Sequence, residues 1–281
     1  MEHGESFRKF QAFHKKIPFF IVGLAIIAIG IFLFAGHRIV AINGEFVLSN
    51  ARSYENHDSN VTDKDLENLK YLTKLEHLSL FAPQITNISF VSEMKDLKSF
   101  SVESQNIVNL DLLKNCKKLE TLYLFDTNLT NLDILTGNTE LRALDIKWGN
   151  PVRDISGLRK LGKLELLSIL SSEITDISPI GSLGSLTFLD LSCGSISDIS
   201  VLADCKSLKR LSLIDCKQVT DISPLAELKY LEEILICNTA INDFTPLLSM
   251  ESLKKVVASD GQIDSSILAK LEAKNIIVEL L

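Results

Sequence analysis

Apolar and polar positions follow one repeating unit of 22 or 23 residues from Leu75 to near the end of the chain. Each unit opens with a leucine, and the nine opening leucines are Leu75, Leu97, Leu119, Leu141, Leu164, Leu186, Leu208, Leu231 and Leu253. Apolar residues recur three and five positions later, and a spacing of two places both side chains on one face of a strand. Each unit therefore predicts a short strand whose inward side chains share one core.

The second part of each unit predicts a bend followed by a short helical turn. Further aliphatic columns begin at Ile85 and at Ile88, and the residue after the second column is of a type favoured as a helix N-cap. These predicted N-caps are Ser89, Asp111, Asp133, Ser156, Ser178, Ser200, Ser223 and Thr245. Pro179, Pro224 and Pro246 follow three of them, at the first helical position, where a missing N–H costs nothing.

Stacking of these units predicts an α/β solenoid, with a parallel β-sheet on its concave face and short helical or 3-10 turns on its convex face. No unit buries its apolar side alone, so the ends need caps. We predict a hairpin and linker at 37–60, a capping partial repeat at 61–74, nine repeats at 75–274 and a capping strand at 275–281. The hairpin turns at Asn43-Gly44, and residues 50–60 are expected to form a polar loop.

A transmembrane helix is predicted to precede the solenoid. Residues 17–36 contain no charge, and twenty helical residues cross the hydrocarbon core of a bilayer. A cleaved signal peptide is the alternative, but this run is longer than a signal h-region and lacks an A-x-A-like site. Four basic residues lie in the tail at 1–16, against two shortly after the helix, so we expect a cytoplasmic N-terminus and extracytoplasmic repeats in a single-pass protein of the cell membrane.

Composition narrows the class of function. The formal net charge is −7, which gives no basic surface for nucleic acid. The five cysteines form no C-x-x-C pair and no Cys/His metal spacing, so small buried hydrophobes are the favoured interpretation. Unpaired thiols are also commoner in reducing compartments, which favours a cytosolic domain and leaves that alternative open.

The chain carries no motif for catalysis. It lacks a P-loop, G-x-G-x-x-G, G-x-S-x-G and H-E-x-x-H, so we expect no enzyme activity, no cofactor and no small-molecule substrate. An aspartate column precedes the helical turns at Asp154, Asp176, Asp198, Asp221 and Asp243. Such carboxylates can bind Ca²⁺, but hydrogen bonding to their own turn backbone is the favoured interpretation, and no metal site is predicted.

The motif L-x-x-L-x-L-x(4)-I-x-D-I-S-P-L, seen from Leu186 to Leu202 and from Ile174 to Ile180, resembles the 22-residue leucine-rich repeats of internalins and of phosphatase-regulator proteins. The resemblance covers about residues 61–281 and implies a curved solenoid that binds other proteins with its strand face. The family pattern has Asn two residues before the Ile column. Here only Asn150 fits, so other residues must form the bend.

Outward strand positions carry unusually large apolar side chains, which mark interfaces when they are exposed. The predicted protein-binding residues are Phe81, Tyr123, Phe125, Trp148, Leu170, Phe188, Arg210 and Ile214. Charged residues surround them on the same strands, as a polar rim surrounds an apolar centre. We therefore predict a membrane-anchored protein of receptor or adhesion type that binds a protein ligand; the alternative is a cytosol-facing scaffold that regulates an enzyme.

Overall fold

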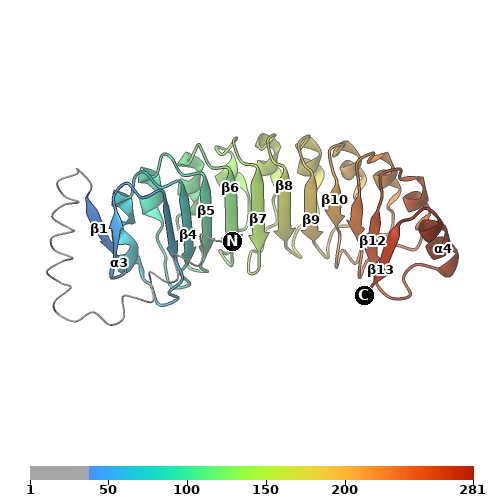
Figure 1. Cartoon of the computed structure of the whole chain (residues 1–281), viewed down its shortest axis with the longest axis horizontal. Coiled ribbons are helices and arrows are strands. Elements are labelled where there is room, and N and C mark those ends of the chain that lie inside the picture. Colours follow the sequence, from blue (N-terminus) through green and yellow to red (C-terminus); the bar gives the residue numbers. More distant parts are fainter. Residues whose placement is uncertain (1–37) are drawn as a thin grey trace.

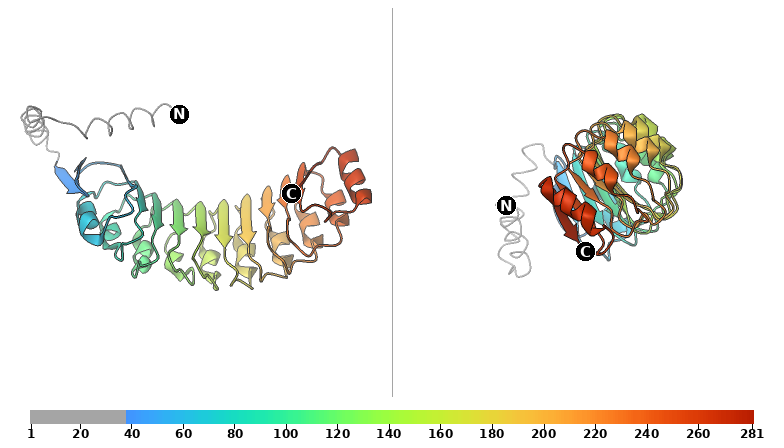
Figure 2. Two further views of the ribbon diagram at one scale, coloured as in Figure 1. Left: turned by 90° about the horizontal axis from the view of Figure 1, so that it is seen from below. Right: turned by 90° about the vertical axis from the view of Figure 1, so that its right-hand side faces the viewer.

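The computed structural model describes residues 38–281, which form one solenoid with its strands side by side (Figure 1). The solenoid is curved, and the strands lie along its concave face (Figure 2). Eleven strands, β3 to β13, form a single sheet in chain order, and every neighbouring pair is parallel. The strands are β3 Ser53–Asn56, β4 His77–Phe81, β5 Ser99–Glu103, β6 Thr121–Phe125, β7 Ala143–Lys147, β8 Leu166–Leu170, β9 Phe188–Ser192, β10 Arg210–Ser212, β11 Glu233–Leu235, β12 Lys255–Ala258 and β13 Ile277–Leu280.

Short 3-10 helices cover the convex side, opposite the sheet (Figure 2). They are η2 Glu67–Tyr71, η3 Ser89–Glu93, η4 Leu110–Asn115, η5 Asp133–Leu135, η6 Ser156–Lys160, η7 Ser178–Ser182, η8 Ser200–Asp204, η9 Ser223–Glu227 and η10 Thr245–Ser249. The predicted leucine-repeat solenoid, with its parallel sheet and helical turns, is confirmed for the described residues.

The core runs the length of the coil between these two layers. All nine opening leucines are buried, as are the two inward positions that follow in each of the nine repeats, such as Leu78 and Leu80 in β4. Full burial of a leucine side chain stabilises by about 1.5–3 kcal/mol. Since each unit contributes several such residues, apolar stacking between coils is the main stabilising term.

The predicted N-caps are wrong by position. The buried column residue, for example Ile155, precedes the first helical residue, and Ser156 is itself the first residue of η6. The free N–H of that first residue is reached by the carboxylate two positions earlier, as in the 2.8 Å bond from Ser156 N to Asp154 Oδ1. Equivalent bonds occur in seven coils, to Asn87, Asn131, Asp154, Asp176, Asp198, Asp221 and Asp243.

These bonds account for the aspartate column without a metal ion. The backbone N–H of residue 156, 178 or 200 holds the pKa of Asp154, Asp176 or Asp198 below its usual value. The predicted position of the prolines is also wrong by one residue, because Pro179 is the second residue of η7 rather than the first. The first-turn amide that proline lacks has no intrahelical partner in either case, so proline remains compatible.

The N-terminal end differs from the predicted polar loop. Within residues 50–60 the chain forms β3, which pairs with β4 and buries Tyr54 and Asn56. Asn56 Nδ2 donates to Phe81 O at 2.9 Å, so a hydrogen-bonded polar side chain occupies the inward position that a leucine occupies in β4. Alternation of polar residues carries no hydrophobic signal, which is why the sequence did not show this strand.

A hairpin of β1 Ile39–Ile42 and β2 Glu45–Leu48 lies beyond β3. Asn43 and Gly44 both have positive φ, which the tight antiparallel turn requires. Val40 and Ile42 are buried in the same core as α3 Asp63–Leu66 and η2. The first coil is therefore covered by a separate two-stranded sheet.

The C-terminal end is closed by α4 Ser265–Ala273, the longest helix among the described residues, and by β13. Asp264 caps α4 through bonds from the N–H groups of Ser266 and Ile267. Ile267 and Leu271 are buried against the last coil.

The predicted transmembrane helix at 17–36 lies outside the described residues. Among residues 38–281, no helix has the length and hydropathy needed to cross a bilayer.

Small polar residues form the bends between strands and helices. Ser104 and Ser171, each three residues before the Ile column, donate through Oγ to Ile85 O and Val152 O of the preceding coil, both at 2.8 Å. Cys216 occupies the same position and donates to Leu191 O at 2.9 Å. The buried donors thus lie one residue earlier than the family's asparagine.

This arrangement predicts unreactive thiols. Burial raises the pKa of Cys193 to about 12 and that of Cys216 to about 11, and the thiolate is the reactive form. We expect the native protein to react slowly with Ellman's reagent at neutral pH, with Cys237, the most exposed, reacting first. In urea all five cysteines should react. Rapid reaction of Cys193 or Cys216 in the native state would contradict this prediction.

Candidate protein-binding face

The outward side chains of the sheet lie in three rows across the concave face. The middle row is Glu55, Ser79, Ser101, Tyr123, Asp145, Ser168, Asp190, Ser212, Leu235, Val257 and Glu279. Parallel strands are about 4.8 Å apart, so neighbours within a row can touch. The rows bring together residues that are 22 or 23 positions apart in the chain.

Three predicted residues form an aromatic ridge, defined here as Tyr123, Phe125 and Trp148. The rings of Tyr123 and Phe125 are stacked, with centroids 6.3 Å apart and planes at 4°. The Phe125 and Trp148 centroids are 5.6 Å apart. Trp148 remains 64% exposed, so the ridge ends in a large apolar side chain that this chain leaves uncovered.

An extra residue in its bend makes Trp148 project from the sheet. Its repeat has 23 residues, and Trp148 and Gly149 both adopt positive φ, of 44° and 56°. A tryptophan in this conformation is strained and needs support from its surroundings. That support is Asn150, whose Nδ2 donates to Trp148 O at 2.9 Å and to Lys147 O at 2.8 Å.

Asn150 also fixes the neighbouring coil. Its Oδ1 accepts from Thr127 N, Thr127 Oγ1 and Leu129 N, at 3.0, 2.8 and 3.1 Å. Its Nδ2 reaches Leu124 O as well, at 3.2 Å. The single residue that fits the family's asparagine position therefore holds the bend that presents Trp148.

The other predicted residues lie on the same face but apart from the ridge. Phe81 is separated from Phe125 by Glu103, and Leu170 follows Lys147 in the third row. Phe188 lies under Arg210, whose guanidinium carbon is 5.7 Å from the ring centroid. Ile214, half-buried after β10, contributes little surface.

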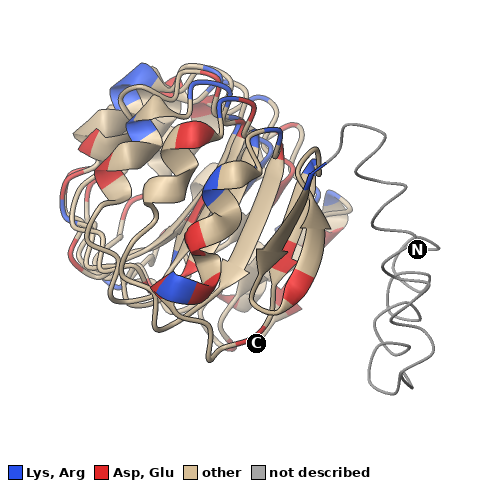
Figure 3. Ribbon diagram, turned by 90° about the vertical axis from the view of Figure 1, so that its left-hand side faces the viewer, with Lys and Arg blue, Asp and Glu red and all other residues tan. Residues whose placement is uncertain are grey.

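Charges divide this face into two parts. Towards the C-terminus, Glu233 bridges Arg210 at 2.8 Å and Lys255 at 3.8 Å, and Lys255 also reaches Glu279 at 2.8 Å. Around the ridge, carboxylates outnumber bases. Over the helices and loops, acidic and basic residues are interleaved when the coil is viewed from its N-terminal end (Figure 3).

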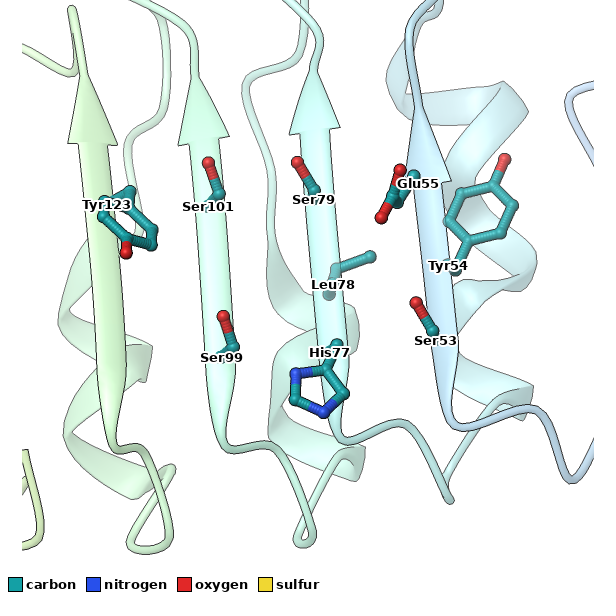
Figure 4. A pocket seen from close by; sticks show the side chains of 9 residues that line it. All are labelled: Ser53, Tyr54, Glu55, His77, Leu78, Ser79, Ser99, Ser101 and Tyr123. Carbon is teal, nitrogen blue, oxygen red and sulfur yellow. The ribbon is translucent and has the colours of Figure 1, made fainter. Parts of the chain in front are cut away.

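A hollow of about 400 Å³ beside the ridge was not predicted from the sequence. Figure 4 shows Ser79, Ser99 and Ser101 lining it, with the Tyr123 ring on one side and Glu55 and His77 on the other. Small outward side chains leave this space between larger neighbours. The available signal was serine at outward positions of two adjacent strands, Ser79 in β4 and Ser99 and Ser101 in β5.

Nothing in the described part of the chain groups three or more metal-ligating side chains. The outward residues instead provide an aromatic surface, carboxylates and hydroxyls, which suit contact with another macromolecule.

Comparisons with known proteins agree with this geometry. A family model for leucine-rich repeats in two copies matches residues 117–160 and 184–227. A solved internalin (inlF) of Listeria monocytogenes is similar at 24% identity and a TM-score of 0.65, over 84% of this chain and 76% of that one. Internalin C2 (inlC2) of the same organism is similar at 28% identity and a TM-score of 0.61, over 68% of this chain and 84% of that one.

A leucine-rich-repeat protein of Leptospira interrogans shares the fold at 17% identity and a TM-score of 0.59, over 76% of this chain and 62% of that one. The comparison with curated proteins found no match. The predicted resemblance is therefore confirmed by both the repeat model and the solved structures. The chain is a leucine-rich-repeat protein with an internalin-like structure.

Proposed function

We propose that this chain captures a protein ligand on its concave face and that the aromatic ridge is the centre of the contact. The observation that carries the proposal is the exposure of Trp148, held upright by Asn150 and packed against Phe125. Tryptophan and tyrosine are the commonest hot-spot residues of protein interfaces. Internalin-like repeats typically support binding rather than catalysis, and the absence of catalytic motifs from the sequence agrees with that role.

We propose further that the chain is a single-pass membrane protein of receptor or adhesion type. Residues 17–36 would act as the anchor, with residues 1–16 in the cytoplasm and the repeats outside. The uncharged run and the excess of basic residues before it support this topology. Protease added to intact cells tests it, because an external repeat domain would be cleaved and a cytosolic one protected.

The alternative is a cytosol-facing scaffold that regulates an enzyme. Five unpaired cysteines favour it, because free thiols are rarer in oxidising compartments. All five are buried, and several occupy bends as weak donors, a role that is the same in either compartment. The protease experiment therefore decides between the two topologies.

Capture of the ligand should depend on the ridge. We expect the double change Phe125→Ala and Trp148→Ala to weaken capture by at least about thirtyfold, because hot-spot residues each contribute about 2 kcal/mol or more. The measurement is a pull-down with the 281-residue chain, followed by quantification of the captured protein. Circular dichroism should show an unchanged fold, since both side chains lie outside the core.

Tyr71→Ala is the matched control. Tyr71 is an exposed aromatic residue on η2, at 56% exposure, and lies on the convex side. Capture should survive this change. Equal capture by the ridge variant and the wild-type chain would remove the concave face from the proposed function.

A further inference from the structure

Asp145 has an unsatisfied oxygen on the concave face. It is the central outward residue of β7, between Tyr123 and Ser168 in the middle row. Oδ2 lies 3.5 Å from Lys147 Nζ, whereas Oδ1 is buried and has no hydrogen-bond partner among residues 38–281. An ionised carboxylate only accepts hydrogen bonds, so a buried oxygen without a donor is costly.

The surroundings of Asp145 are acidic. Asp126 directly follows the adjacent strand β6, and Glu103 of β5 and Asp190 of β9 lie two strands away. None of the three has a salt bridge in the described part of the chain. Lys147 is the basic residue among these carboxylates, and it already forms an ion pair with Asp145. By contrast, the carboxylates towards the C-terminus are neutralised by Arg210 and Lys255.

The ridge adds aromatic faces beside these carboxylates. A cation over an aromatic ring is attracted by the ring's quadrupole, and the attraction grows when the cation is partly desolvated. Arg210 above Phe188 shows that the concave face accommodates a guanidinium in this way. Burial also raises the pKa of Asp145, an effect that a bound cation would oppose.

We propose that the protein ligand presents an arginine or lysine side chain to the ridge, where its cation pairs with the carboxylate of Asp145 beside the rings of Tyr123 and Phe125. The serine-lined hollow next to Tyr123 gives room for the residues that flank this side chain. This inference rests on the proposed function and specifies the chemistry of the ligand.

A random-peptide library selected on the immobilised 281-residue chain provides the test. Selected peptides should be enriched in arginine or lysine, and the Asp145→Asn chain should lose that enrichment. The affinity of one selected peptide is then compared with that of its Arg→Gln or Lys→Gln form. Trp148 is the single tryptophan of the chain and lies in the ridge, so its fluorescence reports binding directly.

The four affinities form a double-mutant cycle, which isolates the contact between the basic residue and Asp145. On the wild-type chain the neutral peptide should bind about tenfold more weakly, a loss of about 1.4 kcal/mol. On Asp145→Asn the two peptides should bind nearly equally. A tenfold difference that persists on Asp145→Asn overturns the proposal.

Glu279→Gln is the matched control, because Glu279 lies in the same row six strands away, outside the hollow, and loses the same charge. This control variant should retain the tenfold difference between the basic and the neutral peptide. If the difference were lost in the control as well, the effect would come from long-range charge, and the proposed contact with Asp145 would be overturned. Phe125→Ala separates the two proposals. Peptides that need Phe125 but show no basic preference overturn only the ligand chemistry, whereas failure to select any Phe125-dependent peptide overturns both.

Discussion

Replacing Asn150 with alanine is expected to destabilise the protein by roughly 3–5 kcal/mol and to disorder the bend that carries Trp148. The side chain is 4% exposed; its Oδ1 accepts three hydrogen bonds, and the two hydrogens of its Nδ2 are shared among three carbonyl oxygens. Alanine would leave the N–H groups of Thr127 and Leu129 without a partner in the interior. Each buried group left unsatisfied costs about 1–3 kcal/mol.

Urea unfolding measures the loss, and hydrogen exchange locates it. The amides of Thr127 and Leu129 should exchange much faster in the variant, because both are bonded to Asn150 Oδ1. Asn106→Ala is the control, since Asn106 is exposed and makes one side-chain bond as donor, to Pro83 O. A loss below about 1 kcal/mol is expected there. Equal effects of the two changes would contradict the role of Asn150.

Gly157→Ala is expected to cost about 3 kcal/mol through a backbone clash on the convex side. Gly157 lies in η6, against Leu132, the residue before η5 in the preceding coil. An added Cβ would overlap the carbonyl oxygen of Leu132 and lie 2.6 Å from its carbon. Backbone atoms cannot rotate away as a side chain can, so neighbouring coils would have to separate.

Gly162→Ala gives the opposite expectation within the same repeat. A Cβ at Gly162 meets nothing within 4 Å, so alanine should be neutral or stabilise by up to about 1 kcal/mol by restricting the unfolded chain. The two midpoints of urea unfolding provide the measurement. A similar midpoint for both variants would show that the coils can move apart freely at Gly157.

Part of the concave face was visible in the alternation of the strands. Because successive side chains point to opposite faces, Tyr123, Phe125 and Phe188 were recognised as outward once the inward leucines were aligned. The alternation does not show which of the outward aromatic side chains touch. Phe81 lies apart from Phe125 because Glu103 is between them on the intervening strand. The hollow beside Tyr123 was also missed, because small serines produce no hydrophobic signal.

The bend at Trp148 could also be predicted only in part. The extra residue of its repeat was evident from the 23-residue spacing, but spacing does not say which residue adopts positive φ. That choice depends on hydrogen bonds from Asn150 to two coils. The thiols were correctly interpreted as buried. Their role as hydrogen-bond donors in the bends could not be predicted, because the carbonyl groups that accept these bonds belong to the preceding coil.

The repeat, the inward columns and the order of strand, bend and helical turn can be predicted from the sequence, because period and alternation are local properties of the chain. Features that depend on a neighbouring coil are set by tertiary contacts. β3 exists because β4 pairs with it, although its residues are mostly polar. Asp145 Oδ1 is left without a donor because of what its neighbouring strands supply. Such features arise between residues about one repeat apart, where hydrogen bonds and contacts join segments that no local pattern links.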